Sequence, residues 1–127
     1  MSSRRIEDLV PELQEKFALF KKMMDEAGIP FMVTCTYRTE AEQLELYAQG
    51  RTKPGQKVTW VRHSKHNDRK AFDIAITRDG KPVWDLKADV NSDQIPDYKQ
   101  AAYIGQDCGL IAGGLWTKKD YPHFEIA

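Results

Sequence analysis

The sequence lacks three features that would assign it to a special class: an excess of charge of one sign, a long hydrophobic run and a cysteine framework. Its 127 residues carry 19 basic and 19 acidic side chains, so no general attraction to nucleic acid or to a membrane surface is expected. The N-terminus leads into an amphipathic pattern, and no apolar stretch reaches the length of a bilayer span. We expect one monomeric domain over residues 1–127, with no signal peptide, no membrane span and no nucleic-acid partner.

Cysteine is scarce, with only Cys35 and Cys108 present. Each has apolar neighbours, and neither has a second ligand at the spacing of a metal-binding motif. This pattern is typical of buried free thiols in a protein made in a reducing compartment.

Hydrophobic periodicity switches between the spacing of helices and that of strands along the chain. A capping box, with Thr39 as N-cap and Glu42 at the third helical position, marks the start of one helix, and Asp79-Gly80 indicates a β-hairpin. The expected helices cover residues 11–27, 39–49 and 97–108, and the expected strands cover residues 31–37, 72–77 and 120–126, with a return strand from residue 82.

Two predicted loops have compositions that could indicate ligand binding. Residues 89–93 begin like a calcium-binding loop, but Gln94 stands where glycine is expected and Gln100 where the bidentate glutamate belongs, so we expect an Asx-rich loop. Residues 51–70 hold seven basic side chains and one acid. Such a run is usually a solvated loop, although it could attract an anionic polymer, either nucleic acid or bacterial envelope.

Two short segments carry the side chains with the most chemistry. His66, Asp73 and His123 form a candidate set of zinc ligands, because imidazole and carboxylate suit zinc and a catalytic zinc keeps three protein ligands plus one water. Asp120, three residues before His123, is close enough in sequence to take a proton from that water. A buried Asp73 would need a partner in any case, and an arginine or a helix cap would also serve.

Each of the other candidates has a second interpretation. Arg38, at the junction of a predicted strand and helix, is either a functional side chain or a surface arginine. Trp116 either lines a pocket or fills the core, and its residue type alone favours the core. His63 and His66, three residues apart in the basic loop, could instead form the metal site of a nuclease, but that reading gives no role to the C-terminal motif.

In combination, these motifs resemble the family of zinc D-Ala-D-Ala carboxypeptidases and L-alanyl-D-glutamate endopeptidases, which includes phage endolysins and vancomycin-resistance dipeptidases. The resemblance spans residues 31–127. It rests on Ser64-x-His66, Ala71-x-Asp73 and Asp120-x-x-His123-Phe124-Glu125, with Tyr37-Arg38-Thr39, Glu42-Gln43, Gly50-Arg51 and Gly113-Gly114-Leu115-Trp116.

The resemblance implies a small α+β fold of the Hedgehog/DD-peptidase type, with about three helices packed on an antiparallel sheet that carries the site. It implies Zn²⁺ as the cofactor and His66, Asp73 and His123 as its ligands. The substrate it implies is the peptidoglycan stem peptide, cut between L-Ala and D-Glu. The chain looks most like endolysins of phages that infect Gram-negative hosts, which stay in the host cytoplasm until they are released onto the periplasmic cell wall.

The resemblance also implies roles for four further residues. Asp120 would be the general base and Arg38 the cation near the scissile carbonyl. Ser64 would contact either the substrate or a residue that holds the metal, and Trp116 would contact the substrate. Two departures from the family pattern stand out. Arg69 replaces the glycine that the family usually has two residues before Ala71, and the base is aspartate where the dipeptidase branch has glutamate, which favours the endolysin branch.

Two rival functions remain open at this point. A D-Ala-D-Ala carboxypeptidase or dipeptidase would use the same site on a different bond. A zinc-bearing cell-wall binding module without catalysis, as in Hedgehog-type domains, would keep the ligands but not the catalytic groups, so the presence of Asp120 and Arg38 argues against it.

Overall fold

The computed structural model describes residues 2–127, which form three α-helices, five β-strands and two short 3-10 helices. The helices are α1 (Pro11–Ala27), α2 (Glu40–Ala48) and α3 (Asp97–Asp107), and the 3-10 helices cover Ile6–Asp8 and Gly113–Leu115. The strands are β1 (Phe31–Cys35), β2 (Ala71–Arg78), β3 (Lys81–Val83), β4 (Ile111–Ala112) and β5 (His123–Glu125). The expected α+β class, with helices packed on a small antiparallel sheet, is confirmed.

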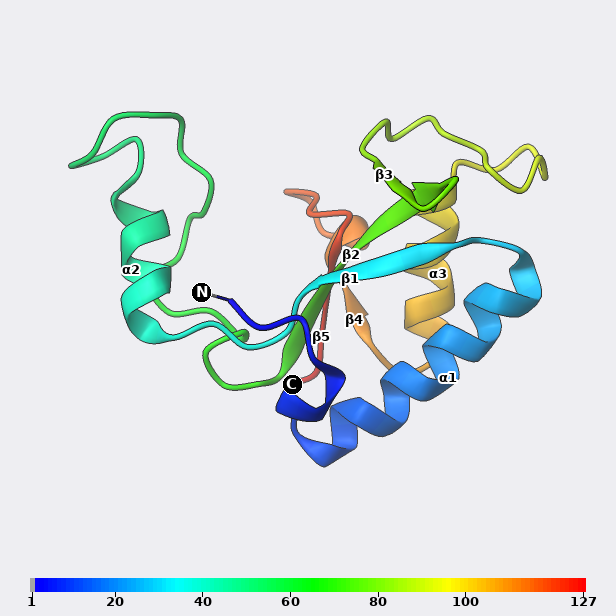
Figure 1. The fold of residues 1–127 in the computed structure, drawn as a ribbon, viewed down its shortest axis with the longest axis horizontal. Coiled ribbons are helices and arrows are strands. Elements are labelled where there is room, and N and C mark those ends of the chain that lie inside the picture. Colours follow the sequence, from blue (N-terminus) through cyan, green and yellow to red (C-terminus); the bar gives the residue numbers. More distant parts are fainter. Residues whose placement is uncertain (1) are drawn as a thin grey trace.

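The strands form one antiparallel sheet in the order β1-β2-β5-β4, and β3 makes a hairpin with β2 (Figure 1). The pairing register places Cys35 of β1 opposite Asp73 of β2, and Asp73 opposite His123 of β5. Side chains of directly opposed residues share one face of a sheet. The register therefore brings three residues that are far apart in the sequence into one row.

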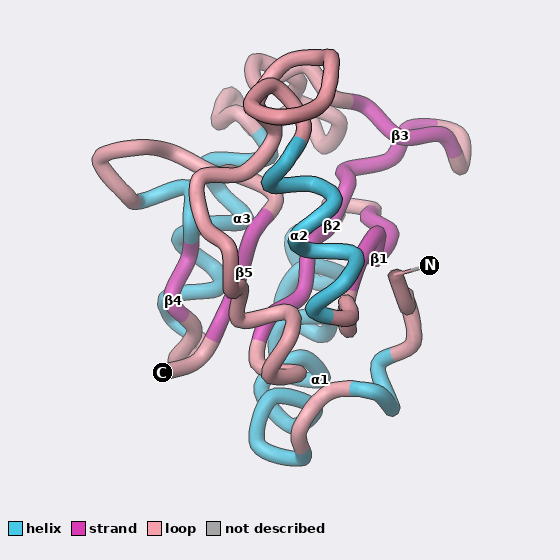
Figure 2. Tube along the Cα trace, turned by 90° about the vertical axis from the view of Figure 1, so that its left-hand side faces the viewer, coloured by secondary structure: helices cyan, strands magenta, loops and turns pink. Residues whose placement is uncertain are grey.

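One face of the sheet is apolar because side chains alternate along β2. Phe72, Ile74 and Ile76 are fully buried, and Phe124 of β5 joins them in the core. Helices α1 and α3 cover this face, whereas α2 and the long loop after it lie on the opposite side of the sheet (Figures 1 and 2). Asp73, at an alternate position, points away from the core and toward that opposite side.

The helix ends follow the local signals in the sequence. Pro11 occupies the first turn of α1, where its missing N–H is not needed, and Gly28 ends the helix in the left-handed conformation. The capping box of α2 is formed, since the Thr39 hydroxyl accepts the Glu42 N–H and the Glu42 carboxylate accepts the Thr39 N–H, each at 3.1 Å. Within the described residues, no helix is long and apolar enough to cross a membrane.

The first strand is shorter than expected. β1 ends at Cys35 instead of Tyr37, and its register with β2 shifts between Val33 and Cys35. The next two residues pair with the N-terminal segment instead, as the Thr36 N–H donates to the Ser3 carbonyl at 2.7 Å and the Ser3 N–H donates to the Tyr37 carbonyl at 2.8 Å. The N-terminal segment thus supports the backbone that leads to Arg38.

Two loops carry residues that the sequence singled out. Asp89 accepts hydrogen bonds from the backbone N–H groups of Asp93 and Gln94, which matches the expected Asx-rich loop. Arg69 adopts a φ of 61°, so the position where the family usually has glycine does have the left-handed backbone that glycine favours. The Arg69 side chain stacks on the Tyr37 ring at 3.9 Å from its centroid.

Candidate active site

The predicted site residues come from separate parts of the chain and meet in one cavity of about 840 Å³, which Leu46 of α2 also lines. β2 and β5 supply two of them, and the others come from the segments before these strands and from the segment between β1 and α2. All seven line the cavity: Arg38, Ser64, His66, Asp73, Trp116, Asp120 and His123.

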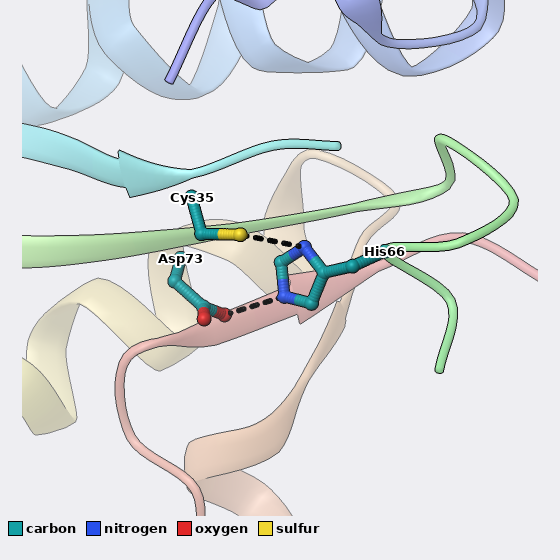
Figure 3. Close-up of side chains that lie close together, drawn as sticks. All are labelled: Cys35, His66 and Asp73. Carbon is teal, nitrogen blue, oxygen red and sulfur yellow. Dashed lines mark hydrogen bonds and ion pairs between the residues drawn. The ribbon is translucent and has the colours of Figure 1, made fainter. Parts of the chain in front are cut away.

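His66 is buried, and both of its ring nitrogens have close neighbours. Nδ1 lies 2.9 Å from the Thr36 carbonyl oxygen and 3.6 Å from Cys35 Sγ, while Nε2 lies 3.1 Å from Asp73 Oδ1 (Figure 3). Because a carbonyl oxygen only accepts hydrogen bonds, Nδ1 carries the hydrogen that Thr36 receives. Within residues 2–127, Nε2 makes no hydrogen bond of good geometry despite its short contact with Asp73. Nε2 is therefore the ring nitrogen available to a ligand.

His123 approaches the same carboxylate oxygen from the other side. Its Nδ1 lies 3.0 Å from Asp73 Oδ1, and its Nε2 lies 2.8 Å from Glu125 Oε1. The two imidazole rings are 5.2 Å apart and close to perpendicular. A carboxylate on the far nitrogen fixes the orientation of a ligating histidine and raises its basicity. Glu125 is placed to do this for His123.

The charges at this centre are strongly coupled. Burial lowers the pKa of both histidines, but the close contacts and charge of Asp73 outweigh burial and raise the pKa of His66 to about 10 and that of His123 to about 9. Burial raises the pKa of Asp73, but the two histidines hold that pKa well below its usual range. Without a metal, one carboxylate thus lies between two protonated rings, and a divalent cation would take the place of their protons.

Two overlapping sets of side chains are candidate metal ligands. The ligand atoms of Cys35, His66 and Asp73 lie within 4.8 Å of one another, and the set expected from the sequence has His123 in place of Cys35. Cys35 faces His66 Nδ1, which already donates to a backbone carbonyl. In contrast, His66 Nε2 and His123 Nδ1 both face Asp73 Oδ1. This orientation favours the second set, whose nitrogen and oxygen donors fit zinc.

Arg38 is held at the cavity by groups behind it. Its NH1 donates to Gln43 Oε1 at 2.8 Å, and its NH2 lies 3.5 Å from Cys35 Sγ, while its buried Nε has no partner within residues 2–127. Gln43 is fully buried, and its Nε2 also donates to the Val61 carbonyl at 2.8 Å and to Thr59 Oγ1 at 3.2 Å. One amide therefore connects the arginine to the loop that walls the cavity.

Asp120 lies at the rim of the cavity, in a turn before β5. The strand therefore starts at His123 and not at residue 120 as expected. The His123 N–H donates to the Asp120 carbonyl, and the Asp120 N–H donates to the Gly113 carbonyl. A Cβ on Gly113 would overlap the Asp120 backbone oxygen, so this close approach requires glycine. Desolvation raises the pKa of Asp120, and the charge of Asp73 adds to this against the opposing charges of the two histidines.

The remaining candidates have defined places. The Ser64 hydroxyl accepts the His66 N–H at 3.2 Å, so it shapes the histidine loop while it lines the cavity. Trp116 is 36% exposed and its ring lies 5.4 Å from that of His123, so of its two interpretations the structure supports the one in which it lines the pocket and not the one in which it fills the core. It directly follows the 3-10 helix Gly113–Leu115. His63 is exposed and pairs with Asp68 at 3.0 Å; it lines the same cavity but is not part of the cluster of Cys35, His66 and Asp73.

Sequence reasoning did not assign roles to several residues that complete the site. Cys35 was expected to be an isolated buried thiol; it is buried and free, but it contacts His66 and Arg38. The roles of Gln43 and Glu125 were also missed, although both belong to the motifs that carried the resemblance. The sequence did offer one indication, because Gln43 and Glu125 are polar residues next to apolar positions of a predicted helix and a predicted strand.

A small α+β fold with a buried cluster of histidine and carboxylate donors is typical of a metallopeptidase. The family model described as D-alanyl-D-alanine carboxypeptidase matches residues 58–126. The chain is also 37% identical over 123 residues to the peptidoglycan L-alanyl-D-glutamate endopeptidase CwlK of Bacillus subtilis (strain 168), covering 94% of this chain and 74% of that protein. The chain belongs to this family of D-alanyl-D-alanine carboxypeptidases, the M15 peptidases.

A solved structure agrees with this assignment at the level of the fold. The crystal structure of the Serratia marcescens L-Ala D-Glu endopeptidase ChiX matches with a TM-score of 0.72, covering 100% of this chain and 89% of that chain. The two sequences are 24% identical. The arrangement of helices and sheet is therefore shared between the two proteins.

Proposed function

We propose that this chain is a zinc-dependent peptidase that hydrolyses the L-Ala–D-Glu bond of the peptidoglycan stem peptide. The observation that carries the proposal is the convergence of His66 Nε2 and His123 Nδ1 on Asp73 Oδ1 in a cavity that Arg38 and Asp120 also line. The similarity to a peptidoglycan L-alanyl-D-glutamate endopeptidase at 37% identity supports the choice of bond.

The residues around the donor centre suit amide hydrolysis. A zinc ion held by His66, Asp73 and His123 would supply Lewis acidity and make water a stronger acid. Asp120, whose pKa is raised, is suited to take a proton from water and return it to the leaving amine. The Arg38 guanidinium places positive charge at the cavity wall, where it stabilises a carbonyl oxygen that becomes negative in the transition state.

A second candidate reaction is the release of terminal D-Ala by a carboxypeptidase. The description of the family model that matches residues 58–126 favours it, and the same donors and base would serve. The two reactions leave different products, because an endopeptidase exposes a new D-Glu amino terminus and a carboxypeptidase liberates free D-Ala.

Mass spectrometry of soluble fragments from Gram-negative peptidoglycan tests this proposal. The zinc-loaded protein should release peptides with a D-Glu amino terminus, and a chelator should abolish the release. Asp120→Asn should slow the reaction by about 10²- to 10⁴-fold while the zinc content stays the same. Asp107→Asn, an exposed change on α3, is the matched control. Undiminished hydrolysis by Asp120→Asn would remove the base assignment, and free D-Ala alone would favour the carboxypeptidase.

We further propose that the enzyme is a phage endolysin, made in the host cytoplasm and released onto the periplasmic cell wall. The support comes from the sequence, where aspartate at position 120 fits the phage branch of the family better than the dipeptidase branch. Expression in a Gram-negative host should cause lysis only when a holin is expressed with it. Lysis without a holin, or no lysis with one, would contradict this role.

A further inference from the structure

The cavity extends beyond the donor centre, and its outer wall is rich in aromatic side chains. The three tryptophans of the sequence, Trp60, Trp84 and Trp116, all line it, with exposed fractions of 58%, 57% and 36%. Large exposed aromatic side chains gathered on one concave surface are typical of a ligand-binding wall. The wall therefore offers contacts to parts of a substrate that lie away from the bond being broken.

Acidic and basic side chains are separated within this cavity. The acids that line it are confined to the donor centre and its rim, where two of the three contact histidines. Apart from Arg38, the basic side chains that line the cavity are three lysines, Lys65 next to His66 in the sequence and Lys118 and Lys119 in the loop before β5. Because the whole chain has a net charge of zero, this local excess of positive charge favours an anionic ligand here.

The three lysines differ in the contacts that their ammonium groups make within the protein. Lys118 Nζ lies 3.3 Å from the centroid of the Trp60 ring, so a cation–π contact joins the loop after α2 to the loop before β5. Lys119 Nζ donates to the Gly114 carbonyl at 3.3 Å. Lys65 is half-buried and adjacent to His66 in the sequence, yet its ammonium has no partner within residues 2–127. Lys65 is thus a cation close to the donor centre that remains free to bind a ligand.

We propose that Lys65 and Lys118 form a carboxylate-binding subsite, which makes the enzyme specific for stem peptides whose D-Glu carries a free α-carboxylate. This inference rests on the proposed function. D-Glu continues the stem through its side-chain carboxyl group, so its α-carboxylate lies one carbon from the nitrogen of the scissile bond. Lys65, beside His66, binds that carboxylate, and Lys118, held by Trp60, binds a carboxylate further along the peptide.

Two synthetic stem peptides that differ only at this group test the proposal. One carries the D-Glu α-carboxylate and the other the neutral α-carboxamide. Wild type should cleave the carboxylate peptide with a kcat/KM about tenfold higher or more, as expected for one charge-assisted hydrogen bond in a partly desolvated site. Lys65→Gln should abolish this preference through a higher KM, with little change in kcat. Lys22→Gln, which removes an exposed lysine of α1, should keep it.

Binding measured separately from cleavage distinguishes failure of the subsite from failure of the proposed reaction. Calorimetry with Asp120→Asn should show tighter binding of the carboxylate peptide, weakened by added salt and by either Lys65→Gln or Lys118→Gln. Selective binding without any cleavage by wild type would refute the proposed reaction and support the subsite. Equal binding of the two peptides, or a preference for the carboxylate peptide that survives Lys65→Gln, would overturn the subsite even if both peptides were cleaved.

Discussion

Replacing Gln43 with methionine tests whether this buried amide organises the site. Methionine keeps the unbranched stem but loses the hydrogen bonds to Arg38, Val61 and Thr59. A neutral hydrogen bond contributes about 1 kcal/mol and one to a charged group about 1.5 to 3 kcal/mol. We expect Gln43→Met to lower the free energy of unfolding by about 2 to 4 kcal/mol, because the loss leaves a guanidinium N–H and a carbonyl without their partners.

Thermal unfolding and peptide hydrolysis measure the two consequences. For a chain of this length, the expected loss corresponds to a Tm lower by roughly 10 °C. The kcat/KM of the folded protein should fall at least about tenfold, since small displacements of a catalytic cation are costly. Gln43→Glu keeps the acceptor that faces Arg38 and loses the donor, so it should retain more activity than Gln43→Met.

An exposed glutamine provides the matched control. Gln106 lies on the outer side of α3, so Gln106→Met should change the free energy of unfolding by less than about 0.5 kcal/mol. If Gln43→Met melted within a degree or two of wild type, or kept full kcat/KM, the reasoning about this amide would be refuted.

Two further predictions concern the backbone and the charges of the site. Arg69→Gly should be more stable than Arg69→Ala by about 1 kcal/mol in urea unfolding, because both lose the side-chain contacts but only glycine relieves the left-handed backbone; equal stability would show that φ of 61° carries no strain. In the chelated protein, the raised pKa values of His66 and His123 stabilise the fold fully below their unfolded value of about 6.5. That contribution should be lost as the pH rises through about 9 to 10, so urea midpoints should fall between pH 6 and pH 10, and a His66→Gln variant should show a smaller fall.

Local signals predicted the elements well because each signal acts within a few residues. The capping box at Thr39 and Glu42, the proline that starts α1 and the Asp79-Gly80 hairpin all appear where the sequence placed them. Each depends on one turn of backbone and its own hydrogen bonds. Element boundaries were less accurate where a distant segment competed, as when Thr36 paired with Ser3 instead of β2.

The site was harder to predict because it depends on pairing between distant strands. Periodicity cannot reveal that Cys35, Asp73 and His123 share one row, since the register shift in β1 and the order of the strands decide it. Burial of a glutamine such as Gln43 is also hard to predict, because glutamine side chains are mostly exposed. The separation of lysines from acids in the cavity likewise appears only when the loops are in place.

We propose that His66, Asp73 and His123, and not Cys35, hold the metal. X-ray absorption spectroscopy of the zinc-loaded protein tests it directly, because a zinc–sulfur distance of about 2.3 Å is distinct from zinc–nitrogen and zinc–oxygen distances of about 2.0 to 2.2 Å. We expect one zinc per chain, bound by nitrogen and oxygen atoms alone, and we expect the same spectrum from Cys35→Ser. A sulfur neighbour in wild type that disappears in Cys35→Ser would contradict it.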